Sequence, residues 1–203
     1  MVELLDNLIQ SGASLLAFLA AGVFYYRTRQ QTVYLLASYL GSFMLGSFHW
    51  TLYLLLFDST PQVFYVSELA WIVATLFLLT LELVLASKEE KKFRHPALFL
   101  VPAFCIPQLI LYLTRGEILV NLLMVGLNMS IAYLALRGLI YARKGQGRAR
   151  IKVYFHAAVL WIIVLEFGLW TSSCFWSSDT LSNPYFWIDF ALSLSLLTLV
   201  PAL

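Results

Sequence analysis

The sequence is poor in charge. Lys, Arg, Asp and Glu make up 12% of its 203 residues, whereas 61% of the residues are hydrophobic. A soluble domain has about 25% charged residues. The few basic residues lie between long apolar runs, so the net charge of +2 is no sign of nucleic-acid binding, and no nucleic-acid partner is predicted. The composition excludes an ordinary soluble domain and predicts an integral membrane protein.

Reactive and metal-binding residue types are also scarce. The chain has two cysteines and three histidines. Cys105 and Cys174 lie in different apolar runs without the spacing of a metal site, so we interpret both as packing residues. The sequence has no HExxH or GxSxG motif, and its last apolar run has no lysine that would hold retinal. We predict no metal and no cofactor, and an enzyme is not the favoured interpretation.

Seven apolar runs are each long enough to cross a bilayer as a helix, which needs about 20 residues. They cover residues 8–26, 32–57, 62–87, 96–114, 117–141, 152–176 and 185–203. The sequence has no soluble domain and no clear internal repeat. We therefore predict an all-α bundle of seven transmembrane helices, a single domain over residues 1–203, in the cell membrane with the lipid bilayer as a partner.

The basic residues predict the orientation of the bundle. Twelve of the thirteen Lys and Arg residues lie in segments 27–29, 88–95 and 143–150 or in the helix ends that flank them, and only Arg115 lies on the opposite side. By the positive-inside rule these three segments are cytoplasmic, so the N-terminus is outside and the last helix ends inside. That helix has no basic anchor at its end. We therefore expect either a missing short tail or a parent chain that continues past Leu203 into the cytoplasm.

Polar side chains form stripes along the predicted helices. Residues three or four apart share a face of a helix, and ionisable groups in a bilayer usually face the interior of a bundle. The stripes are Ser38, Ser42, Gly46, His49 and Tyr53; Tyr65, Glu68, Ile72, Thr75 and Glu82; Asn121 and Asn128; Glu166, Trp170 and Ser173; Asp189 and Ser193; and Asn7, Ser11 and Ser14. We therefore predict a bundle with a polar interior.

Several of these side chains fall at a similar depth in the outer half of the bundle. At a rise of 1.5 Å per residue, His49 lies roughly 12 Å and Glu68 roughly 9 Å from the outer ends of their helices. Because a short loop joins these two helices, we expect His49 and Glu68 to face each other. Carboxylates and indoles at one level predict an outward-opening pocket for a small cationic or aromatic molecule. The predicted ligand-binding residues are His49, Trp50, Glu68, Trp71, Glu166, Trp170 and Asp189.

Two neighbouring segments carry a resemblance to known proteins. Residues 46–53 read Gly-Ser-Phe-His-Trp-Thr-Leu-Tyr and end one apolar run, and residues 65–71 read Tyr-Val-Ser-Glu-Leu-Ala-Trp and begin the next. This region resembles the membrane-embedded seven-helix sensory input segments of bacterial signalling proteins. Those segments have a small residue, an acidic residue and a Trp at the end of one helix, and here Ser-Phe-His replaces the acid. The resemblance implies a ligand-sensing module whose last helix leads to a cytoplasmic kinase or cyclase.

The leading prediction is a sensor or receptor module, and the polar interior leaves other functions open. A transporter of a small solute or a proton-coupled substrate is one alternative. Its usual sign is a broken helix, which only residues 96–114, with Pro102 and Pro107, offer. A lipid-modifying membrane enzyme with Glu68 and His49 as acid and base is a second alternative. A helper subunit without a ligand is a third.

Overall fold

The computed structural model describes residues 2–57, 59–61, 66–145 and 152–203. Over these residues it contains helices only, as the sequence predicts. The elements are α1 (Val2–Thr28), α2 (Gln31–Phe57), α3 (Val66–Leu85), α4 (Lys88–Lys92), the 3-10 helix η1 (Pro96–Phe99), α5 (Leu100–Leu113), α6 (Ile118–Lys144), α7 (Lys152–Ser173) and α8 (Pro184–Ala202). Seven segments are long and apolar enough to cross a membrane, namely α1, α2, α3, η1 with α5, α6, α7 and α8. Tyr65, which the sequence places in a polar stripe, lies outside the described residues.

Local sequence accounts for several helix ends. Pro184 occupies the first turn of α8, and the side chain of Asn183 accepts a hydrogen bond from the Tyr185 backbone N–H. The short helix α4 lies in a segment that the sequence assigns to a loop. Its start is a Ser-x-x-Glu capping sequence, in which Ser87 Oγ accepts from the Glu90 N–H at 3.1 Å. This cap therefore stabilises a short helix within the charged segment that connects two long helices.

The first helix begins earlier than its apolar run. α1 starts at Val2, six residues before the first residue of the predicted helix, and the added turns carry Asp6 and Asn7. Both side chains are buried. Hydropathy alone places polar residues outside a span, whereas this bundle takes them into its interior where other helices supply partners.

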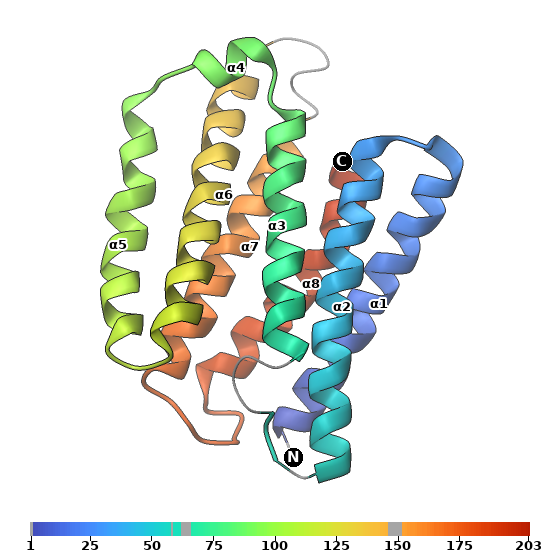
Figure 1. The fold of residues 1–203 in the computed structure, drawn as a ribbon, viewed down its shortest axis with the longest axis vertical. Coiled ribbons are helices and arrows are strands. Elements are labelled where there is room, and N and C mark those ends of the chain that lie inside the picture. Colours follow the sequence, from blue (N-terminus) through green and yellow to red (C-terminus); the bar gives the residue numbers. More distant parts are fainter. Residues whose placement is uncertain (1, 58, 62–65, 146–151) are drawn as a thin grey trace.

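Six of the long helices form a closed ring. Along the ring α1 packs against α2, α2 against α3, α3 against α6, α6 against α7, α7 against α8, and α8 against α1. Helix α5 lies outside this ring, at the edge of the bundle against α6 and α7 (Figure 1). The bundle therefore has an interior that six helices enclose, and the helix with Pro102 and Pro107 is peripheral.

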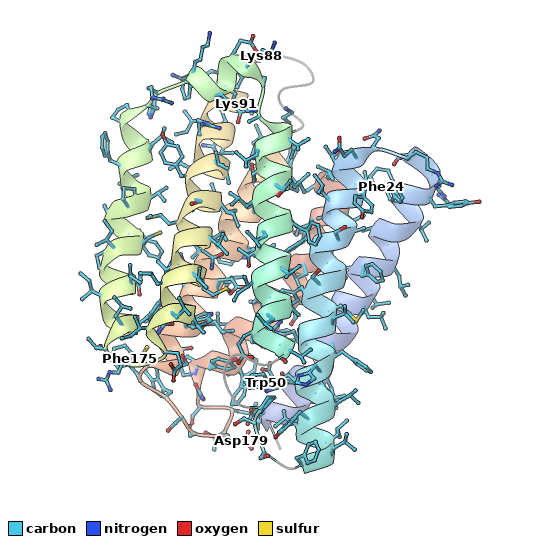
Figure 2. All side chains as sticks on the ribbon, in the orientation of Figure 1. Phe24, Trp50, Lys88, Lys91, Phe175 and Asp179 are labelled. Carbon is cyan, nitrogen blue, oxygen red and sulfur yellow. The ribbon has the colours of Figure 1, made fainter. Side chains whose placement is uncertain are left out.

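The two ends of the bundle differ in charge, and its outside is apolar. We call the end that carries α4 and the chain's last residues the C-terminal end, and the opposite end, where α1 starts, the N-terminal end (Figure 1). Lys88 and Lys91 lie at the C-terminal end, and Phe175 and Asp179 lie at the N-terminal end (Figure 2). Between them large apolar side chains are exposed, for example Leu16, Leu56 and Phe99 at 62%, 72% and 77%. Seven apolar helices with such a surface fit a multi-pass membrane protein.

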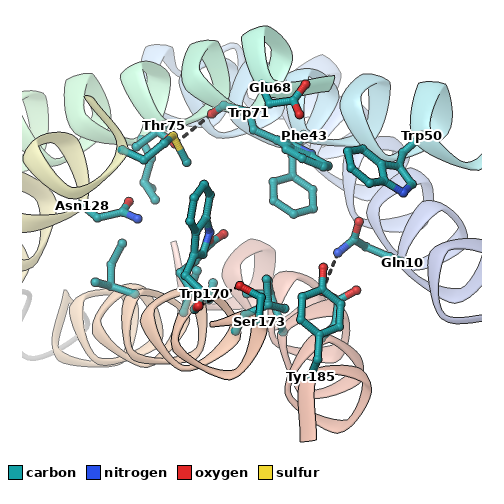
Figure 3. Close-up of a pocket in the computed structure, with 18 of the residues that line it drawn as sticks. Gln10, Phe43, Trp50, Glu68, Trp71, Thr75, Asn128, Trp170, Ser173 and Tyr185 are labelled. Carbon is teal, nitrogen blue, oxygen red and sulfur yellow. Dashed lines mark hydrogen bonds between the residues drawn. The ribbon is translucent and has the colours of Figure 1, made fainter. Parts of the chain in front are cut away.

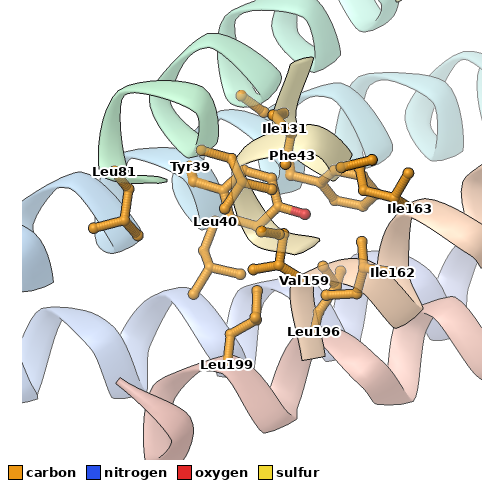
Figure 4. Packing of buried hydrophobic residues seen from close by; sticks show 14 of the residues in the cluster. Tyr39, Leu40, Phe43, Leu81, Ile131, Val159, Ile162, Ile163, Leu196 and Leu199 are labelled. Carbon is orange, nitrogen blue, oxygen red and sulfur yellow. The ribbon is translucent and has the colours of Figure 1, made fainter. Parts of the chain in front are cut away.

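A hydrophobic core fills the ring towards the C-terminal end. Leu40, Leu81, Val159, Leu196 and Leu199 come from α2, α3, α7 and α8, and each is 0% exposed. Their side chains converge in the middle of the ring (Figure 4). The enclosed interior is therefore closed at this end by close-packed side chains.

A buried contact between Glu82 and His156 joins α3 and α7 near the C-terminal end. His156 Nδ1 lies 3.0 Å from Glu82 Oε2, and each side chain is 1% exposed. The buried side chains of Arg137 on α6 and Glu90 on α4 also act on Glu82 electrostatically. A buried polar group without a partner is costly, so this cluster restricts how the four helices can meet.

Gly138 on α6 gives the His156 ring its space. A Cβ atom at Gly138 would lie 2.5 Å from His156 Cε1 and Nε2. Gly138→Ala should therefore lower the free energy of unfolding by about 1–3 kcal/mol, the usual cost of overpacking, because the imidazole must move away from Glu82. The measurement is thermal unfolding of the purified protein in detergent.

Gly126→Ala is the matched control in the same helix. Nothing lies within 4 Å of a Cβ added there, so this variant should be neutral or more stable by up to about 1 kcal/mol, since Ala favours helix. Equal melting temperatures for the two variants would contradict the close approach of α6 to His156.

Candidate functional site

A cavity of about 230 Å³ lies inside the ring of helices. All six ring helices contribute to its wall and α5 does not. The lining residues are Asn7, Gln10, Tyr39, Phe43, Trp50, Glu68, Trp71, Thr75, Leu78, Met124, Asn128, Ile162, Ile163, Glu166, Leu169, Trp170, Ser173, Tyr185, Asp189 and Leu192. Because every ring helix touches it, a molecule in this cavity would contact the whole ring at once.

Most of the residues predicted to bind a ligand line this one cavity. They are Trp50, Glu68, Trp71, Glu166, Trp170 and Asp189, which come from α2, α3, α7 and α8. Figure 3 shows the Trp170 side chain between α7 and α3, with Trp50, Phe43 and Trp71 on the opposite side of the cavity. The depths and helical faces inferred from the sequence therefore agree with the positions of these six side chains around one cavity. Their role in binding stays a prediction.

His49 is the predicted residue that does not line the cavity. Its Nδ1 lies 2.9 Å from Ser67 Oγ, and that hydroxyl donates to the Gly46 carbonyl oxygen at 2.9 Å. Consecutive residues of a helix point about 100° apart. Helix α3 thus presents Ser67 to His49 and Glu68 to the cavity. The short connection does make α2 and α3 neighbours, but His49 pairs with Ser67 and does not face Glu68 as predicted.

The three carboxyl groups of the wall stand on three helices. Glu68 on α3 is 9% exposed and Asp189 on α8 is 2% exposed, while Glu166 on α7 is partly buried. Glu166 and Asp189 are close enough to interact electrostatically, and the Trp170 side chain lies near Glu166. Among the described residues that line the cavity there is no Lys, Arg or His. The wall is therefore acidic and aromatic.

Gln10 connects three helices behind this wall. Its amide Nε2 donates to Asp189 Oδ1 at 2.5 Å, and its Oε1 accepts from Ser47 Oγ at 2.7 Å. Beside it, Thr51 Oγ1 donates to the Asn7 carbonyl oxygen at 3.1 Å. These contacts bind α1 to α2 and α8 and hold one face of the Asp189 carboxyl group in place.

Sequence reasoning missed Gln10, Tyr39 and Tyr185 as lining residues. The signal was present for two of them, because Gln10 lies three residues after Asn7 and Tyr185 lies four residues before Asp189, on the same helical faces. Asn128, Thr75 and Ser173, which the polar stripes contain, also reach the cavity. In the described part of the chain no three His, Cys, Asp or Glu side chains are grouped closely enough to hold a metal ion.

A second cavity, of about 210 Å³, adjoins the first at the N-terminal end of the bundle. Glu68, Trp170 and Ser173 line both cavities. The rest of its wall is Tyr112, Arg115, Gly116, Glu117, Val120, Asn121 and Cys174. The Tyr112 hydroxyl donates to the Phe167 carbonyl oxygen at 2.8 Å and anchors the end of α5 to α7. The turn between α5 and α6 is thereby placed beside the ring, next to Glu68.

Known proteins give no guide to this site. A scan against protein-family models, a search of curated proteins and a search of solved structures each return no match. The function must therefore be argued from the geometry and chemistry of the cavities.

The Gln10 contacts predict a clear loss of stability on truncation. Gln10→Ala leaves Asp189 and Ser47 without their buried partner, so the free energy of unfolding should fall by about 1–3 kcal/mol. Thermal unfolding in detergent measures the change. Gln31→Ala, at an exposed glutamine that begins α2, is the control and should stay within about 0.5 kcal/mol of wild type. A Gln10→Ala protein as stable as the control would mean that this connection contributes nothing.

Proposed function

We propose that the protein is a membrane sensor or receptor module that binds a small cationic or aromatic molecule in the first cavity. The observation that carries the proposal is the content of its wall. Three carboxyl groups and the rings of Tyr39, Phe43, Trp50, Trp71, Trp170 and Tyr185 surround one space, and no basic side chain is among the described lining residues.

Electrostatics favour a cation in this space. A carboxylate that leaves water loses much hydration free energy, and the loss is offset only by a nearby positive charge, a proton or several hydrogen bonds. Asp189 has Gln10 as a neutral donor, and the Trp170 indole lies near Glu166. A ligand ammonium group would supply the positive charge that the described lining residues lack, and indole faces attract cations as well.

The enclosure of the cavity favours a receptor over a through-pathway. Leu78, Ile162 and Leu192 form its inner wall, and beyond them lies the core of Leu81 and Leu199 that fills the ring. A solute could pass only if these packed helices separated. A ligand that touches six helices can instead shift their relative packing, which is how binding biases one state of a receptor. In the proposed arrangement a cytoplasmic signalling domain or partner after Leu203 would read this change.

The same proposal places the cavities on the outer side of the membrane. The described Lys and Arg residues near the bundle ends lie at the C-terminal end, except for Arg115 at the N-terminal end. The positive-inside rule then makes the C-terminal end cytoplasmic. Both cavities would open towards the cell exterior.

Cysteine labelling tests this orientation. In a Cys105→Ala/Cys174→Ser background, Ser59→Cys and Ser177→Cys should react with a membrane-impermeant maleimide in intact cells. Glu89→Cys and Lys92→Cys should react only after the membrane is permeabilised, because all four positions are exposed but lie at opposite ends. The reverse labelling pattern would place the cavities on the cytoplasmic side.

Ligand binding is tested by thermal stabilisation. A ligand that binds only the folded state stabilises it by RT ln(1 + [L]/Kd), about 2.7 kcal/mol at one hundred times Kd. A panel of small amines and aromatic cations should therefore contain compounds that raise the melting temperature of the purified protein. Glu68→Gln should reduce this response at least severalfold without unfolding the protein, since Gln keeps the shape of Glu.

Glu89→Gln, at an exposed carboxylate on α4, is the control and should respond like wild type. The proposal is wrong if no cation stabilises the protein or if Glu68→Gln leaves the response unchanged. Accumulation of a stabilising cation inside proteoliposomes would favour the transporter instead.

A further inference from the structure

The two cavities together have the size of one small-molecule site. Ligand pockets usually enclose about 300–1,000 Å³. The first cavity has about 230 Å³ and the second about 210 Å³, and they share Glu68, Trp170 and Ser173. Each cavity alone is smaller than a usual pocket, whereas the two joined fall within the range. We propose that they form one site for a zwitterionic ligand with an aromatic body, an inference that rests on the proposed function and specifies its ligand class.

The charges of the second cavity differ from those of the first. Arg115 is the only Lys or Arg among the described residues that line either cavity. Its guanidinium is exposed, and Cζ lies 5.9 Å from the centroid of the Phe175 ring, which supports the side chain from one side. Arginine binds a carboxylate with two parallel hydrogen bonds. The second cavity therefore offers a site for an anionic group beside the acidic first cavity.

Glu68 makes a zwitterion the best fit. Glu68 lines both cavities, so an ammonium group beside Glu68 stands next to the place where Arg115 would hold an anionic group. Glu117 also lines the second cavity and repels a ligand that is only anionic. A molecule with both charges can contact Glu68 and Arg115 at once, and its aromatic body can enter the first cavity between Phe43 and Trp170.

Two matched probes separate the charges. Tryptamine and L-tryptophan share the indole and the ammonium group, and only tryptophan has a carboxylate. In the purified protein, Arg115→Gln should raise the Kd of tryptophan about two- to fivefold, the size expected for an accessible ion pair, and leave the Kd of tryptamine unchanged or lower. Arg115→Lys should recover part of the tryptophan affinity. Arg94→Gln, at an exposed arginine of the other end, should change neither value.

Cys174 reports where the probes bind. It lines the second cavity and is partly exposed, whereas Cys105 is 1% exposed. Tryptophan should slow maleimide labelling of Cys174 in the wild type, and should slow it less in Arg115→Gln. Tryptamine, which has no group for Arg115, should protect the thiol less than tryptophan.

The outcomes distinguish the proposed zwitterion site from the proposed cation receptor on which it rests. Tryptamine binding that depends on Glu68, combined with no tryptophan binding or with tryptophan binding that is indifferent to Arg115, would overturn the zwitterion site and leave the cation receptor intact. If cations in general fail to bind and neither probe protects Cys174, both proposals fall.

Discussion

Polar side chains inside an apolar bundle need partners from within the bundle, because lipid offers none. This constraint accounts for the arrangement of the ring. Gln10 reaches Asp189 and Ser47, His49 reaches Ser67, and Glu82 reaches His156. Each contact joins different helices, so satisfying a polar group also fixes a helix neighbour. In the proposed receptor, the same constraint makes the first cavity, whose described lining residues include carboxyl groups but no Lys, Arg or His, a place where a cationic ligand supplies the opposite charge.

The interior of the ring has two parts, a packed hydrophobic core and a cavity. Towards the C-terminal end, the leucines of α2, α3 and α8 pack around Val159, and beyond them the pair of Glu82 and His156 is closed off from solvent. Towards the N-terminal end, aromatic side chains leave space between the helices. A packed core transmits small displacements because it cannot be compressed. In the proposed receptor, a ligand that rearranges the aromatic wall would therefore change how α3, α7 and α8 meet at the opposite end.

The sequence was sufficient for the seven long helices and for about half of the residues that line the cavity, since long apolar runs and three-to-four spacing are local signals. The spacing placed Glu166, Trp170 and Asp189 on inward faces, and the structure puts them there. It could not find the Gln10 bridge or the exclusion of α5 from the ring, because both depend on which helices are neighbours. Nor could it decide between Ser67 and Glu68 as the partner of His49. That choice depends on how α3 is rotated about its own axis, and the packing of the helices determines this rotation.

The central claim, a cavity that prefers cations, is tested most directly by fluorescence quenching. Trp161, Trp176 and Trp187 are exposed on the outside, so replacing them with Phe leaves Trp50, Trp71 and Trp170 of the cavity as reporters. N-methylpyridinium, an aromatic cation, should quench this variant saturably and at lower concentration than neutral acrylamide, while iodide should quench least. Quenching that never saturates, or that iodide matches, would contradict the account.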